Sequence, residues 1–127
     1  MKNFRDLMVW EKSHLLTLDV YKVTAEFPKD ERFGLISQMR RCAVSVPSNI
    51  AEGCGRRGNG EFHKFLQIAT GSASELEYQL LLAKDLAYVK ENIHKELSTK
   101  VIEVQKMLAG LILKVENERL KASAAHN

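Results

Sequence analysis

Apolar residues recur every three or four positions over residues 62–87, the spacing that places side chains on one face of an α-helix. The members of this stripe are Phe62, Phe65, Ala69, Ala73, Leu76, Leu80, Ala83 and Ala87. The stripe predicts a long helix that buries one face against other helices. The middle of the segment is poor in large side chains, and Gly71 costs about 1 kcal/mol relative to alanine in a helix. We therefore expect another backbone, from this chain or from a second copy, to approach closely there.

Three further segments repeat this spacing and lie within 7–27, 30–51 and 97–115. Their apolar positions are Val9, Leu16, Val20, Val23 and Phe27, then Ile36, Met39, Ala43, Val46 and Ile50, then Leu97, Val101, Val104, Leu108, Leu111 and Val115. Pro28 ends the first segment, because proline has no amide hydrogen to donate. Asp30 is a candidate cap for the second.

Four helices of similar length with short links predict an all-α, up-down-up-down four-helix bundle over residues 1–116. Residues 117–127 lose the apolar stripe, and we expect a frayed or disordered tail there. The length of 127 residues and the 45% hydrophobic content fit one compact domain.

No apolar run is long enough to cross a bilayer, and charges interrupt the first residues where a signal peptide needs an apolar segment. A cytoplasmic location with two free thiols, rather than a disulfide, is the expectation.

Pro47 lies inside the apolar stripe of the second helix. A proline within a helix costs about 3 kcal/mol or more and leaves the carbonyl four residues earlier, that of Ala43, without its partner. Either the helix kinks at Pro47 and Ser48 or Asn49 helps to satisfy the freed backbone, or the helix ends at Val46. We favour the kink, because Ile50 stays in register with the stripe.

The positive charge of the chain is concentrated between residues 40 and 64. This stretch carries a balance of +3, which equals the net charge of all 127 residues, and it holds both cysteines and four of the seven glycines. Its basic residues are Arg40, Arg41, Arg56, Arg57 and Lys64. We interpret the stretch as a bend between two helices with a surface for RNA or another polyanion. Adjacent arginines on a helix point about 100° apart, and we expect Arg40 or Arg41 to pair with an acid such as Glu52 or Glu75.

The segment GCGRRG at 53–58 matches GxGxxG, but the dinucleotide-binding motif follows a strand, whereas this segment follows a helix. We therefore predict no nicotinamide or flavin site. The glycine amides with Arg56 and Arg57 remain a candidate phosphate contact, and a flexible link with solvated arginines is the alternative. Neither cysteine has a histidine with an orienting partner, and the serines lie outside a GxSxG setting. We predict no enzyme and no cofactor.

The motif Glu-x-x-His occurs twice, ending at His14 and at His94. Two such motifs help to build the di-iron centre of some four-helix bundles. In an up-down-up-down bundle the first and fourth helices are antiparallel, so these histidines would lie at opposite ends. We predict solvated histidines and no metal site.

Three longer segments occur in a specific order: FRDLMVWEKS, FPKDERFGLISQMRRCAVSVPSNIAEGCGR and EFHKFLQIATGSASELEYQLLLA. Over about residues 4–115 the chain resembles the bacterial four-helix-bundle proteins encoded within intervening sequences of large-subunit ribosomal RNA genes. The resemblance implies a small cytoplasmic protein, typically a homopentamer, with no established catalysis. More distant relatives are accessory subunits of diversity-generating retroelements, which bind nucleic acid and a reverse transcriptase.

The positions that match this family are Arg40, Arg41, Ser45, Pro47, Asn49, Glu52, Gly53, Arg56, Glu61, Phe62, Gly71, Ser72 and Glu75. Among them, Pro47, Asn49, Gly53 and Gly71 are the expected structural positions. Two residues depart from the pattern. Gly58 replaces an expected capping serine, which weakens the start of the third helix by a few tenths of a kcal/mol. Thr70 stands where a basic residue is common in the family. This weakens the expectation that basic residues form a continuous ring.

The leading hypothesis is a non-enzymatic, self-assembling bundle whose arginine-rich surface binds RNA or another polyanion. Its expected partners are further copies of the chain and RNA or a nucleic-acid enzyme. The alternative is an oligomeric interaction scaffold, in which the same arginines form ion pairs between helices or subunits.

Overall fold

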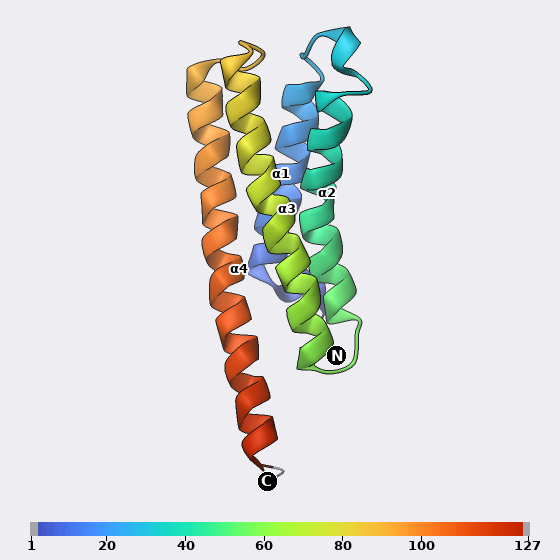
Figure 1. Ribbon diagram of the computed structural model, residues 1–127, viewed down its shortest axis with the longest axis vertical. Coiled ribbons are helices and arrows are strands. Elements are labelled where there is room, and N and C mark those ends of the chain that lie inside the picture. The colour runs from blue at the N-terminus through green and yellow to red at the C-terminus, as the bar shows by residue number, and fades with distance from the viewer. Residues whose placement is uncertain (1–2, 126–127) are drawn as a thin grey trace.

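The computed structural model describes residues 3–125, and that part of the chain is helical without strands. Its elements are the short 3₁₀ helix η1 (Phe4–Asp6), α1 (Met8–Thr24), the 3₁₀ helix η2 (Lys29–Glu31), α2 (Leu35–Cys54), α3 (Asn59–Asp85) and α4 (Glu91–Ala125). The chain reverses direction after each of the first three long helices (Figure 1). Each long helix packs against two others. The predicted all-α, up-down-up-down four-helix bundle is confirmed.

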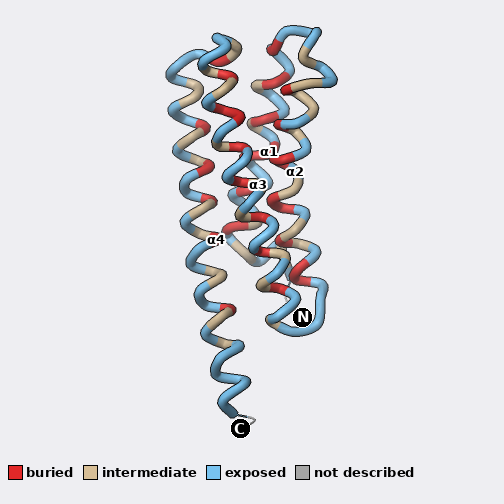
Figure 2. Tube along the Cα trace, in the orientation of Figure 1, coloured by how far each residue is buried: buried red, intermediate tan, exposed pale blue. Residues whose placement is uncertain are grey.

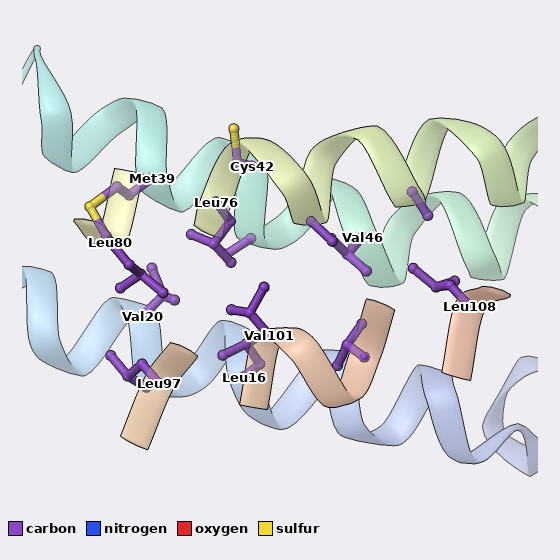
Figure 3. Packing of buried hydrophobic residues seen from close by; sticks show 14 of the residues in the cluster. Leu16, Val20, Met39, Cys42, Val46, Leu76, Leu80, Leu97, Val101 and Leu108 are labelled. Atoms are coloured by element: carbon purple, nitrogen blue, oxygen red, sulfur yellow. The ribbon is translucent and has the colours of Figure 1, made fainter. Parts of the chain in front are cut away.

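The core lies along the axis of the bundle, where the buried faces of the four helices meet (Figure 2). Leucine, valine and methionine side chains from all four helices fill it (Figure 3). Almost all of the stripe residues named from the sequence are buried or half-buried. Ala87 differs, because α3 ends at Asp85 and Ala87 is exposed in the following turn with φ +63°.

Pro47 is accommodated within a continuous α2, which excludes the alternative in which the helix ends at Val46. The kink itself stays a prediction. The sequence predicts that Ser48 or Asn49 satisfies the backbone freed by Pro47, but neither of them bonds the Ala43 carbonyl. The partner of this carbonyl is the hydroxyl of Thr17 on α1, which lies 2.9 Å from the Ala43 oxygen and 2.8 Å from the Ser13 oxygen. A buried carbonyl without a partner is costly, so this contact from the neighbouring helix compensates for the proline.

The turn between α2 and α3 depends on two glycines. A Cβ atom at Gly53 would lie 2.9 Å from Cδ1 of Phe62 and 3.0 Å from Cβ of Phe65, so the small residue permits the close approach of the two helices. Gly58 precedes α3 with φ +80°, a conformation that glycine adopts without strain. Gly58 is the N-cap of α3 and no side chain caps this helix, as expected from the sequence, but a serine would be strained at this φ.

Helix α2 begins after Gly34, and the carboxylate that serves its first turn belongs to Glu31 rather than to the expected Asp30. The Leu35 amide donates to Oε1 of Glu31 (3.3 Å), and the hydroxyl of Tyr88 donates to Oε2 (2.8 Å). Glu31 thereby joins the η2 segment to the turn between α3 and α4.

Helix α4 continues beyond the rest of the bundle (Figure 1). Residues 117–125 are helical and almost all exposed, which differs from the expected frayed tail; residues 126 and 127 lie outside the described part. At Gly71, where a close neighbour was expected, no other described helix comes within 4 Å of a Cβ position. None of the described helices is both long enough and apolar enough to span a membrane.

Candidate polyanion-binding surface

The five basic residues named from the sequence form two groups rather than one patch. Arg40 and Arg41 lie in the second turn of α2, whereas Arg56, Arg57 and Lys64 lie at its far end and at the start of α3. Arg41 lies 13 positions before Cys54, the last residue of α2, which corresponds to about 20 Å along the helix. The predicted bend therefore carries only the second group, and the first group lies near η2.

Arg40 is fixed by groups that leave its charge uncompensated. Its Nε donates to the buried hydroxyl of Thr24 (2.9 Å), and its Nη2 donates to the carbonyl of Tyr21 (3.2 Å). The guanidinium carbon lies 4.6 Å from the centre of the Tyr21 ring, a cation–π contact. A hydroxyl, a carbonyl and an aromatic ring orient the cation without neutralising it.

An open groove of about 480 Å³ lies beside Arg40, between the end of α1, η2 and the start of α2. We call it the η2 groove. It is lined by Tyr21, Arg32, Phe33, Ile36, Ser37, Arg40, Arg41 and Val44. Three of these residues are cations and none is an acid. The groove is therefore electropositive, and it also presents aromatic side chains.

The second group, the α2–α3 turn, lies among carboxylates. Nη2 of Arg56 is 2.7 Å from Oε2 of Glu52, one helical turn earlier. Nε2 of His63 lies 3.1 Å from Oε2 of Glu116 on α4, and Asn59 donates to Glu118 on the same helix (3.2 Å). Arg57 and Lys64 are exposed and make no ion pair within residues 3–125. Acidic groups thus partly offset the positive charge of this turn.

The acid pairings expected from the sequence are wrong for Arg40 and Arg41. Glu52 pairs with Arg56. Glu75 instead accepts a hydrogen bond from the thiol of Cys42 (2.7 Å) and a longer one from Gln79 (3.4 Å). Arg41 is exposed, and no carboxylate of the described residues pairs with it. Neither arginine of the first group pairs with an acid within residues 3–125.

Cys42 and Cys54 are both buried, and no disulfide joins them. Burial, together with the hydrogen bond to Glu75, raises the pKa of the Cys42 thiol to about 11. The sulfur turns away from the centre of the core toward the edge of the bundle (Figure 3). A thiol that stays protonated at neutral pH is a poor nucleophile, so Cys42 has a packing role.

Several residues that match the family pattern form one hydrogen-bond network between α2 and α3. The hydroxyls of Ser45 and Ser72 lie 2.7 Å apart. The side-chain amide of Asn49 donates to the carbonyl oxygen (2.8 Å) and to the hydroxyl oxygen (3.0 Å) of Ser45. This network joins α2 to α3 one helical turn after Arg41. Asn49 therefore has a structural role.

The two histidines of the Glu-x-x-His motifs have local partners. The ring of His14 stacks on Trp10 with centroids 5.1 Å apart, and Nε2 of His94 lies 3.1 Å from the Ser98 hydroxyl. Within residues 3–125, no three or more histidine, cysteine, aspartate or glutamate side chains group in a way that could hold a metal ion.

Sequence reasoning missed three residues of the η2 groove: Tyr21, Arg32 and Phe33. Arg32 and Phe33 lie between Pro28 and Ile36, the first apolar position of the second helix, where the sequence carries no helical periodicity. Tyr21 lies in the first predicted helix next to the stripe residue Val20, and 42% of it is exposed. The adjacent Arg-Phe pair in an otherwise polar link was the available signal, because an aromatic residue there has no core to enter.

The fold and the two basic groups define a small all-α bundle protein. Residues 5–110 match the family model described as 23S rRNA-intervening sequence protein, and the chain belongs to this family. A similar solved structure is a protein of unknown function from the S23 ribosomal protein family of Bacteroides thetaiotaomicron VPI-5482. The two are 25% identical with a TM-score of 0.75, over 83% of this chain and 98% of the other. No curated protein matches the chain.

Proposed function

We propose that this protein is a non-enzymatic, self-assembling bundle of the cytoplasm that binds RNA or another polyanion through Arg40, Arg41, Arg56, Arg57 and Lys64. One observation carries the proposal: within the described chain, only Arg56 of these five residues is paired with a carboxylate. Uncompensated cations at a surface attract phosphates and release condensed counterions when they bind. The family description, which refers to an intervening sequence of 23S rRNA, is compatible with an RNA ligand.

Self-assembly is the second part of the proposal, with five copies as the expected number from the family resemblance. The outer face of α3 supports it. Ile68, Tyr78 and Leu81 are exposed there, and the space around Gly71 is open. A second copy could cover this face and meet the backbone at Gly71. Size exclusion with light scattering should give a mass of five chains, and a monomer would contradict this part.

Binding of a structured RNA at two salt concentrations tests the polyanion proposal. Affinity should fall steeply as salt rises, since each phosphate contact releases counterions. Arg41→Glu should weaken binding and reduce the salt dependence. Lys106→Glu makes the same charge change at an exposed position of α4 away from both basic groups and should have a smaller effect. An absence of binding by the unaltered protein at low salt would remove the proposal.

An interaction scaffold remains the second candidate, and the Arg56–Glu52 pair favours it, since the same kind of ion pair could form between subunits. In that case Arg41→Glu should split the oligomer. Light scattering on this variant separates the two functions, because the polyanion proposal expects the assembly to stay intact.

A further inference from the structure

We propose that the η2 groove is a subsite for an unpaired nucleotide segment, in which a base stacks on Phe33 and the flanking phosphates contact Arg32 and Arg41. The inference rests on the proposed polyanion binding and specifies the ligand at one of its two basic groups. The subsite adds Arg32, Phe33 and Tyr21 to the residues named in the proposed function.

The charge of the groove selects an anion. Arg32, Arg40 and Arg41 line it, and no acidic side chain does. Arg32 and Arg41 are exposed. Arg40 is held between Thr24 and Tyr21, so its charge occupies a fixed position in the wall. One oriented cation and two exposed ones suit a ligand that carries several negative charges along its length.

The aromatic side chains select an unpaired base. Phe33 is 88% exposed, the most exposed of the large hydrophobic residues in the described chain. The guanidinium of Arg32 lies 5.4 Å from its ring centre, so a cation and an open ring adjoin each other. Bases stack on such rings without regard to sequence. In a duplex the base faces are already stacked on one another, and only an unpaired segment offers them to a protein.

The segment that carries Arg32 and Phe33 is anchored from behind. Both carboxylate oxygens of Glu31 accept hydrogen bonds, one from the Leu35 amide and one from Tyr88. The ring of Tyr88 in turn contacts Phe27, with centroids 5.4 Å apart. The hydrogen bonds to both oxygens of Glu31 fix this short 3₁₀ turn, and so the backbone next to Arg32 and Phe33, before a ligand binds. Such preorganisation lowers the entropy lost on binding.

The ring of Phe33 is the part of this site that electrostatics alone would not need, so substitutions there provide the test. Binding of an unstructured oligouridine is compared with binding of an RNA duplex of equal length, at low salt. Phe33→Ala and Phe33→Leu should each weaken oligouridine binding by about fivefold or more, the lower end for one stacked base. Phe33→Trp should bind oligouridine with the affinity of the unaltered protein. Bound oligouridine should also quench the fluorescence of the tryptophan introduced at position 33. Duplex binding should change little in all three variants.

The controls separate this inference from the function on which it rests. If Phe33→Ala and Phe33→Leu bind oligouridine like the unaltered protein, while Arg41→Gln weakens both RNAs, the stacking subsite is refuted and polyanion binding stands. If the unaltered protein binds neither RNA, both proposals fail. If Phe33→Ala changes the mass in light scattering, Phe33 belongs to a subunit interface and the inference is overturned. Because Phe33 lies outside the core, each variant should fold.

Discussion

The η2 groove and the α2–α3 turn carry similar numbers of cations, yet they hold them in different ways. Arg40 is oriented by a hydroxyl, a carbonyl and a ring, none of which cancels its charge. Arg56 also lies over a ring, that of Phe65, but Glu52 neutralises it. The wall of the groove contains no acid, whereas Glu116 and Glu118 of α4 contact residues of the turn.

This difference shows that a count of basic residues does not measure the positive surface that a ligand meets. Fixing an arginine with neutral groups keeps its charge available and reduces its motion, whereas a carboxylate partner competes directly with a phosphate. On this basis the groove should contribute more to polyanion binding than the turn, although the turn has the denser run of basic residues in the sequence. The following changes test how each region is held.

The largest expected effect is at the base of the turn. In Gly53→Ala the new Cβ would meet Phe62 and Phe65 at about 3 Å, and a buried aromatic ring cannot yield cheaply there. In Gly55→Ala the nearest atom is 3.5 Å away, an ordinary contact. Gly53→Ala should therefore be less stable than Gly55→Ala by about 2 kcal/mol, measured by denaturant unfolding. Equal stabilities would mean that the two helices do not need the close approach at Gly53.

The second effect concerns the support of Arg40. Thr24→Val keeps the shape of a fully buried side chain but removes the oxygen that accepts from Nε of Arg40. We expect a loss of about 1 to 2 kcal/mol of unfolding free energy, because a charged donor loses its buried partner. Thr70→Val is the matched control, since the Thr70 hydroxyl bonds only the Leu66 carbonyl of its own helix. If both variants lose the same stability, Thr24 has no special role in fixing Arg40.

A pH effect of about 1 kcal/mol is expected from Cys42, which neighbours Arg41. Burial raises the pKa of this thiol from 9.0 to about 11 in the folded state. The folded protein therefore binds the proton more tightly than the unfolded chain, so stability is full below pH 9 and falls as the pH rises toward 11. Between pH 8 and pH 10 the free energy of unfolding should drop by about 1 kcal/mol.

Comparison with Cys42→Ala isolates this thiol from the tyrosines and lysines that titrate in the same range. The drop between pH 8 and pH 10 should be smaller by about 1 kcal/mol in the variant. An identical drop in both proteins would contradict a protonated, buried Cys42.

The helices could be predicted from the sequence because the apolar spacing is a local property of each segment. The family resemblance fixed the same architecture independently. What could not be predicted is how distant elements serve one another. Thr17 lies 26 positions before Ala43, and nothing in the local pattern indicates that its hydroxyl meets the carbonyl freed by Pro47. Likewise, the φ of Gly58 depends on the path of the turn.

The candidate site shows the same limit. The basic residues were found by composition, but closeness in sequence was taken as closeness in space. Arg41 lies near the start of α2 and Arg56 lies just past its end, so the length of this helix keeps them apart. Phe33 entered the site only because η2 places it beside Arg40 and Arg41. The role of a residue in an aperiodic link depends on tertiary packing, which the sequence pattern does not encode.

The smallest expected effect on stability is the most direct test of the contrast between the two regions. Glu52→Gln removes the carboxylate that neutralises Arg56, and an exposed pair one helical turn apart contributes only about 0.3 to 0.5 kcal/mol. The variant should fold normally, yet its affinity for RNA at low salt should rise, because Arg56 becomes available to a phosphate.

Glu96→Gln makes the same charge change at an exposed pair with Lys100 on α4, so it measures the general effect of losing one negative charge. A gain confined to Glu52→Gln would show that the partner of each arginine limits binding at the turn. Equal gains in RNA affinity for both variants would mean that only the net charge of the protein matters. No gain for Glu52→Gln would mean that the α2–α3 turn does not contact the RNA.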